Sequence, residues 1–151
     1  MNVIIYEKIK PKIKDNLLSN HNYTEKEMKE LYPELKLIRS EHKVKQGYCF
    51  NYALKDYSDI HAFPEDKYNY LKDHYKNINL EDIKAGDLVT IHDDIDPNEY
   101  NIQHYAKIIK TDNTLKGTII RSKWGIMGIW QGRIDIIPDS YGNIILFWKK
   151  K

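Results

Sequence analysis

Residues 46–54 read QGYCFNYAL, and this stretch, which holds the only cysteine, decides the fold of the chain. Phe50, Ala53 and Leu54 recur at helical spacing after a glycine, so the pattern predicts that Cys49 opens a helix. A thiol at a helix N-terminus lies near unpaired backbone N–H groups and the positive end of the helix dipole, which favour the thiolate. We therefore expect Cys49 to be a nucleophile with a lowered pKa.

Two later segments have the pattern of strands. Residues 84–89, KAGDLV, predict a turn that enters a strand, and residues 104–109, HYAKII, predict a strand that begins with His104. A helix that begins with cysteine and a strand that begins with histidine supply a nucleophile and a base. Only the fold can bring the two side chains together.

This order of motifs resembles the papain-like cysteine hydrolases of the NlpC and CHAP type. Those families carry a catalytic cysteine at the start of a helix, in a context similar to residues 48–53. A Gly-Asp-aliphatic strand follows, matched by residues 86–89, and then a His-hydrophobe-Ala/Gly strand, matched by residues 104–106. The resemblance covers about residues 45–125, with looser agreement to the C-terminus.

The resemblance implies a papain-like fold of the α+β class, with N-terminal helices packed on a C-terminal antiparallel sheet. The helix-rich first half and strand-rich second half of the sequence favour the same class. We expect one domain over residues 1–151, made of an N-terminal helical extension over 1–44 and a catalytic core over 45–151. A capping-box pattern at residues 24–27 predicts a helix in the extension, ended by Pro33.

The family chemistry implies a role for each candidate residue. The Cys49 thiolate would attack an amide carbonyl, and His104 would hold the thiolate and later protonate the leaving nitrogen. The backbone N–H of Cys49 would stabilise the oxyanion, with Gln46 as a second donor by analogy with the glutamine upstream of the papain nucleophile. Tyr48 and Trp124 are candidates for the substrate cleft. No cofactor and no metal are expected.

Strand parity identifies a candidate that would orient the His104 ring. If Thr111 pairs with Gly117 in a hairpin, then Ser122 lies on the same face of the sheet as His104. A register slip of one residue would instead bring Arg121 or Lys123 to that face. Serine departs from the His, Asn, Asp or Glu that is usual at this place in the family.

Two other features have more than one interpretation. Trp124 belongs to the segment WGIMGIW, residues 124–130, and could line the cleft or pack in the core. Residues 92–99, HDDIDPNE, form a loop dense in carboxylates. Its spacing matches no calcium loop, so we expect a solvated acidic loop, which would favour amine-bearing substrates if it bordered the site.

The resemblance implies several functions. The first is a peptidoglycan peptidase or amidase, as in a phage lysin or an antibacterial effector; the second is an intracellular deamidase or acyl-transfer toxin that acts on a protein. The third is an inactive binding module, in which Cys49 is a buried structural thiol. The formal net charge of +2 argues against a dedicated nucleic-acid binder.

The same sequence gives expectations about location. The chain has no apolar run of signal-peptide or membrane-spanning length, so we expect it to be cytoplasmic as synthesised and not to engage a membrane. Export or release by another route stays open. The single cysteine can form no intramolecular disulfide, so an oxidising compartment is not implied.

Overall fold

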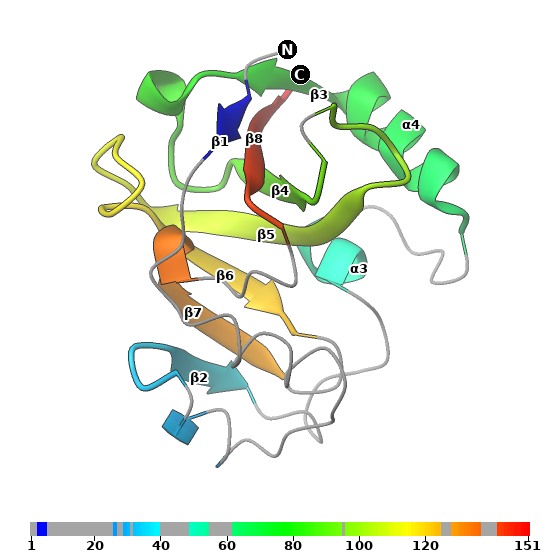
Figure 1. The fold of residues 1–151 in the computed structure, drawn as a ribbon. Helices are drawn as coiled ribbons and strands as arrows, with labels where there is room; N and C mark the ends of the chain where they lie inside the picture. The colour runs from blue at the N-terminus through cyan, green and yellow to red at the C-terminus, as the bar shows by residue number, and fades with distance from the viewer. Residues whose placement is uncertain are drawn as a thin grey trace.

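The computed structural model describes residues 3–5, 26, 29–30, 32–39, 49–54, 62–94, 96–124, 128–136 and 142–151. These residues form mainly an antiparallel sheet of eight strands (Figure 1). The strands are β1 (Ile4–Ile5), β2 (Lys36–Arg39), β3 (Tyr75–Ile78), β4 (Leu88–His92), β5 (Ile102–Lys110), β6 (Ile119–Lys123), β7 (Ile129–Arg133) and β8 (Ile144–Lys150). The helices with described bounds are α3 (Cys49–Ala53) and α4 (Pro64–His74), with 3-10 turns η2 (Leu80–Asp82) and η3 (Ile134–Ile136).

The expected papain-like α+β arrangement is wrong. The strand order is β1-β8-β4-β5-β6-β7-β2, with β3 also paired to β8, and α3 and α4 span only 5 and 11 residues. Before Cys49, residues 26, 29 and 30 are helical, in the segment where the capping box predicted a helix, but the described chain also supplies β1 and β2 at the two ends of the strand order. The molecule is a small β-rich fold.

The sheet has a separate hydrophobic cluster on each face. One cluster contains Val89, Ala106, Ile120 and Trp124, among others, and we call its side the first face. The other contains Phe50, Leu71, Leu88, Tyr105 and Trp148, among others, and includes the buried side chains of α3 and α4; we call its side the second face. Alternating side chains along each strand divide between the clusters. The candidate site is therefore built across a sheet that is covered on both faces.

The central strands are buried on both faces. All five residues of β4 are buried, as are the first five of β8, residues 144–148, IILFW. An uninterrupted apolar run of this kind is typical of a strand covered on both sides. The two strands pair in register, with Val89 opposite Phe147 and Ile91 opposite Ile145. These pairs form the rigid centre from which β5 extends the sheet toward the site.

The two helices cover the second face. Cys49 opens α3 as expected, and Phe50 and Ala53 are its buried residues. Pro64 begins α4, which ends at His74, and Tyr75 then starts β3, although its spacing from Tyr68 and Leu71 continues the helical pattern. Tyr75 pairs with Lys150, so tertiary pairing with β8 ends the helix.

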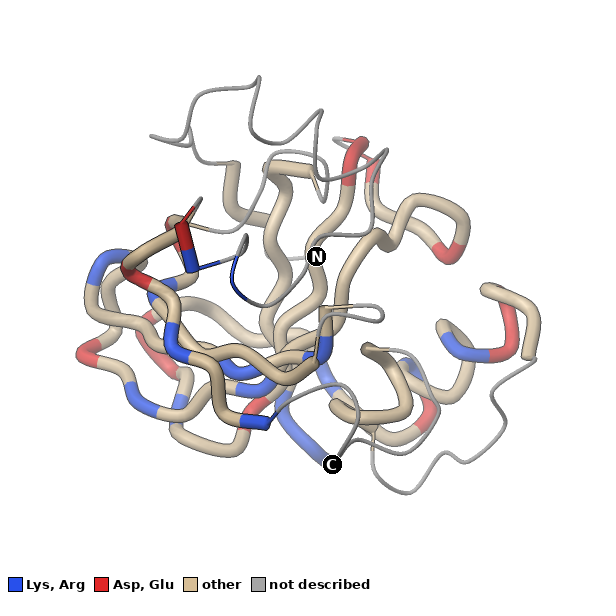
Figure 2. The backbone as a smooth tube through the Cα atoms, turned by 90° about the horizontal axis from the view of Figure 1, so that it is seen from below, with Lys and Arg blue, Asp and Glu red and all other residues tan. Residues whose placement is uncertain are grey.

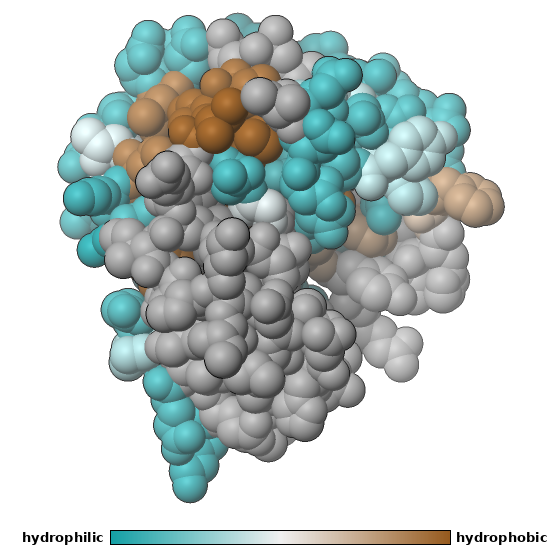
Figure 3. Space-filling model, in the orientation of Figure 1, coloured by the Kyte–Doolittle hydropathy of each residue, from teal (hydrophilic) through white to brown (hydrophobic). Residues whose placement is uncertain are grey.

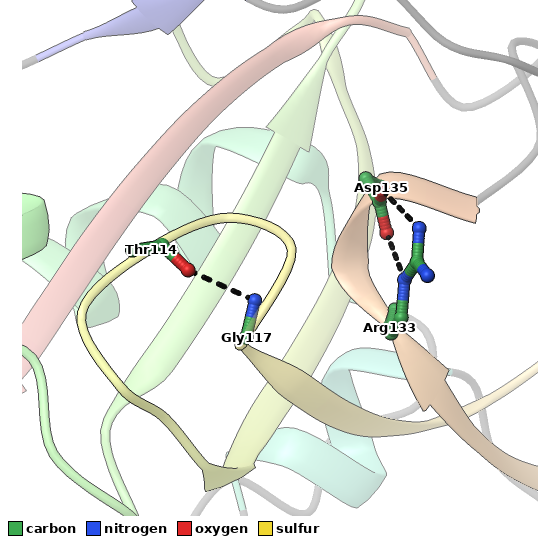
Figure 4. A network of polar contacts seen from close by, with 4 residues as sticks. All are labelled: Thr114, Gly117, Arg133 and Asp135. Atoms are coloured by element: carbon green, nitrogen blue, oxygen red, sulfur yellow. Dashed lines mark hydrogen bonds and ion pairs between the residues drawn. The ribbon is translucent and has the colours of Figure 1, made fainter.

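The other edge of the sheet is closed by β2. Leu35 is buried over β7 at Gly132, where a Cβ atom would collide with the Leu35 side chain. At the end of β7, the Arg133 guanidinium donates two parallel hydrogen bonds to the carboxylate of Asp135 in η3 (Figure 4). The turn between β5 and β6 is held by Gly117, whose N–H donates to the Thr114 hydroxyl in the same view.

The surface carries both charges. Figure 2 shows Lys and Arg interspersed with Asp and Glu along the described backbone, in agreement with the small net charge. An apolar area lies near β1 in Figure 3, where Ile5 is 56% exposed. None of the helices in the described ranges is long and apolar enough to cross a membrane.

Candidate active site

His104 and Ser122 are in contact, as strand parity predicted. The His104 Nε2 and Ser122 Oγ atoms are 2.8 Å apart, and the Trp124 Nε1–H donates to the same oxygen at 3.0 Å. The His104 and Trp124 rings meet edge to face, with centroids 6.4 Å apart. All three side chains are only 1% exposed, so this polar group is embedded in the first-face core.

The register of β5 and β6 explains this contact. Lys107 pairs with Arg121 and Ile108 with Ile120, the parity that the sequence predicted. A bulge near the turn then shifts the pairing, so that Lys110 lies opposite Ile119. The irregularity is confined to the hairpin end, and the register toward His104 is unaffected.

The Cys49 thiol lies on the second face. It is half-buried, and it accepts hydrogen bonds from the backbone N–H groups of Tyr105 and Phe50. Burial is the largest influence and raises the pKa of Cys49 above its ordinary value, against the lowering effect of these N–H groups and of Lys67. The expected lowered pKa is therefore wrong, because a five-residue helix packed on the sheet removes more solvent than its N–H groups compensate.

The structure brings the cysteine helix and the histidine strand together. Phe50 packs edge to face on Tyr105, with ring centroids 6.2 Å apart. Because Tyr105 follows His104 on β5, the two side chains point to opposite faces. The sulfur of Cys49 thus lies at the β5 backbone, one residue from His104.

Lys67 on α4 is a neighbour of the thiol that the sequence analysis did not find. Its Nζ atom lies 4.1 Å from the centroid of the Phe50 ring. Burial lowers the pKa of Lys67, and interaction with Cys49 raises it. Lys67 lies four residues before buried Leu71, so its place beside the apolar stripe of the helix was the available signal.

The other predicted site residues differ in how they are placed. Gln46 and Tyr48 lie outside the described residues. Trp124 packs edge to face on buried Tyr32, at 5.9 Å between centroids, which agrees with core packing. Among the described residues, no group of three or more His, Cys, Asp and Glu side chains could hold a metal ion.

A second buried histidine was also missed. His92, assigned to the acidic loop from sequence, is the last residue of β4 and has no exposed surface. Its Nδ1 lies 2.8 Å from the Asn101 Oδ1 atom, and its Nε2 lies 2.9 Å from the Thr90 hydroxyl. The alternation of Leu88, Thr90 and His92 on one face was the signal for this position.

The directions of these hydrogen bonds define the state of His92. Asn101 Oδ1 also accepts from the Asn98 N–H at 3.0 Å, so it is an acceptor toward the ring. The Trp148 Nε1–H donates to Thr90 at 2.8 Å, and the Thr90 hydroxyl can donate onward to Nε2. The contacts therefore suit a neutral ring, and burial lowers the pKa of His92.

No family model matches the chain, and neither a curated protein nor a solved structure matches it. The resemblance to the NlpC and CHAP families therefore stays a prediction from its three sequence motifs. The function has to be argued from the side chains themselves.

Proposed function

We propose that this protein is a cysteine hydrolase of amide or peptide bonds, in which Cys49 is the nucleophile and His104 the base. The observation that carries the proposal is the 2.8 Å contact between Ser122 Oγ and His104 Nε2, on the strand that packs against the cysteine helix. A base whose second ring nitrogen is oriented by a neighbour is the arrangement that nucleophilic catalysis requires.

The hydrogen bonds of Ser122 favour one tautomer of His104. The serine oxygen already accepts the Trp124 N–H, and it has a further lone pair for a hydrogen on Nε2 of His104. With hydrogen on Nε2, Nδ1 is the basic nitrogen of the ring. In the mechanism that we propose, Nδ1 accepts the proton of the Cys49 thiol. Ser122 would then act as a neutral counterpart of the polar residue that orients a catalytic imidazole.

The raised pKa of Cys49 determines how the nucleophile forms. A buried neutral thiol must lose its proton as it attacks, so His104 acts as a general base and not as one half of a resting ion pair. The sulfur bonds to the carbonyl carbon, the proton passes to His104, and His104 then returns it to the leaving nitrogen. Water, deprotonated by the same ring, cleaves the thioester and releases the acid.

The attack requires the ring and the thiol to meet. The thiol accepts a hydrogen bond from the backbone N–H of Tyr105, the residue after His104. The sulfur is therefore held at the strand that carries the base. The ring keeps its Ser122 contact on the first face, so the proton transfer that we propose requires the Cys49 side chain to move toward Nδ1. The oxyanion of the tetrahedral intermediate would be stabilised by backbone N–H groups next to Cys49.

The substrate class that we propose is the peptide part of peptidoglycan, which the motif resemblance implies. Purified sacculi should release peptides or free amines with the parent protein and release none with Cys49→Ala. Release of ammonia from a protein substrate, with intact sacculi, would replace this substrate class by deamidation. If neither substrate is cleaved, and no thiol-directed acyl probe labels Cys49, the protein is not a cysteine hydrolase.

A further inference from the structure

Lys67 joins the two helices of the second face at the candidate nucleophile. Its Nζ atom lies over the Phe50 ring at 4.1 Å, and Phe50 follows Cys49 in the chain. The side chain is only partly exposed. A lysine in this position packs its aliphatic stem against apolar surface and holds its ammonium group over an aromatic face. The charge is thereby held over the ring of the residue that follows Cys49.

We propose that Lys67 is a positioning residue that stabilises the Cys49 thiolate through its fixed positive charge. The inference rests on the proposed function, because it concerns how that nucleophile becomes reactive. It also assigns the contact between α3 and α4 a role beyond packing.

The site needs such a charge for three reasons. Ser122 is neutral, so it adds no charge to balance the ion pair that forms when His104 takes the proton. Helix α3 has five residues, too short to supply a strong dipole. The thiol is half-buried, which disfavours its charged form. Among the described residues, the charge of Lys67 acts on the thiol. Lys67 lowers the pKa of Cys49, and Cys49 raises the pKa of Lys67, so each group favours the charged form of the other.

The chain offers a matched control for the packing part of this contact. Lys72 lies five residues further along α4 and holds its Nζ atom 4.7 Å from the Tyr68 centroid. Its contact is the same in kind as that of Lys67 with Phe50, but its charge is not among those that act on the thiol. A purely structural role would make Lys67→Met and Lys72→Met behave alike.

The test is the rate of Cys49 alkylation by iodoacetamide as a function of pH in the folded variants. We expect Lys67→Met to react about threefold to tenfold more slowly at neutral pH, as removal of a nearby opposite charge predicts, with its inflection at higher pH. Lys67→Arg should restore the parental profile, and Lys72→Met should retain it. Circular dichroism and the urea midpoint confirm that each variant is folded.

Two results would overturn the inference: an unchanged profile in Lys67→Met, or an equal slowing in folded Lys67→Met and Lys67→Arg. Alkylation reads the thiol without any substrate, so this test is separate from the hydrolase proposal. A slowed Lys67→Met in a protein that cleaves no amide would support the charge role and contradict the hydrolase. Amide cleavage by the parent, together with an unchanged alkylation profile in Lys67→Met, would support the hydrolase and contradict the charge role of Lys67.

Discussion

The Ser122 hydroxyl holds Nε2 of His104 at 2.8 Å, from the neighbouring strand and within a fully buried polar group. Both residues come from regular strands, so their separation is set by the backbone register and not by a mobile loop. An orienting contact built in this way is rigid. It leaves Nδ1 as the nitrogen that would accept the proton of the Cys49 thiol.

Ser122→Ala should leave a folded protein with partial activity. Ser122 orients the ring but neither forms nor breaks a bond, so its loss slows amide hydrolysis without abolishing it. The double variant with His104→Ala should be no slower than His104→Ala alone, because residues that act as a unit have non-additive effects. Full activity in Ser122→Ala would contradict the orienting role. Loss of the hydrogen bond from the Trp124 N–H to Ser122 should also cost about 1 kcal/mol in urea unfolding.

The pH dependence of Cys49 should follow its burial. Because burial raises the pKa of the thiol, the alkylation rate should rise with pH through an inflection above that of a free cysteine. The same protein unfolded in urea supplies the reference curve. An inflection below the unfolded reference would show a thiolate stabilised at rest and would contradict the general-base step.

His92 should make the stability depend on pH. Its pKa is lowered by burial in the folded state from an ordinary value of 6.5, so the unfolded chain binds the proton first as pH falls. The contribution of His92 to the free energy of unfolding is complete above about pH 6.5 and is lost progressively below that pH. Urea midpoints measured from about pH 5 to about pH 8 should show this loss in the parent and a smaller one in His92→Gln.

The control for that experiment is the exposed His74, at the end of α4. His74→Gln should keep the parental pH dependence. His92→Gln should in addition lose about 1–3 kcal/mol at neutral pH, because Thr90 and Asn101 lose a buried partner. If His92→Gln loses as much stability on acidification as the parent does, the buried contacts of His92 with Thr90 and Asn101 are not the source of that loss.

Gly142 should be the less replaceable of two glycines with positive φ. Gly142 and Gly86 have φ values of 93° and 95°, so alanine is strained at both. At Gly142 a Cβ atom would also overlap the carbonyl of His92, whereas at Gly86 it meets nothing within 4 Å. Gly86→Ala should cost about 1 kcal/mol and Gly142→Ala several times more. Equal urea midpoints would contradict the packing of residue 142 on β4.

The sequence predicted the local features of the site well where one periodicity dominated. The helix that Cys49 opens, a strand that contains His104 and the face of Ser122 all follow from spacing within one element or one hairpin. The strand begins two residues earlier than predicted, at Ile102. The face of Ser122 follows from parity because the bulge in the hairpin lies near the turn, so the pairing that the bulge displaces is not the pairing near His104.

The fold class and the state of the thiol could not be predicted in this way. Leu35 and Leu37 belong to a segment that pairs with β7, and Tyr75 continues a helical spacing but pairs with β8. Partners that are distant in the chain decide both cases, and local propensity does not show them. The pKa of Cys49 depends likewise on burial of the thiol against the second-face cluster, which no motif encodes.

The most direct test of the account measures covalent labelling of Cys49 by an electrophilic acyl probe directed at thiols, read by intact mass. The folded parent should be labelled once, at Cys49 and faster than the urea-unfolded chain, while folded His104→Ala should be labelled slowly and Cys49→Ala not at all. Labelling of folded His104→Ala at the parental rate, or a folded parent no more reactive than the unfolded chain, would contradict the claim that His104 activates Cys49.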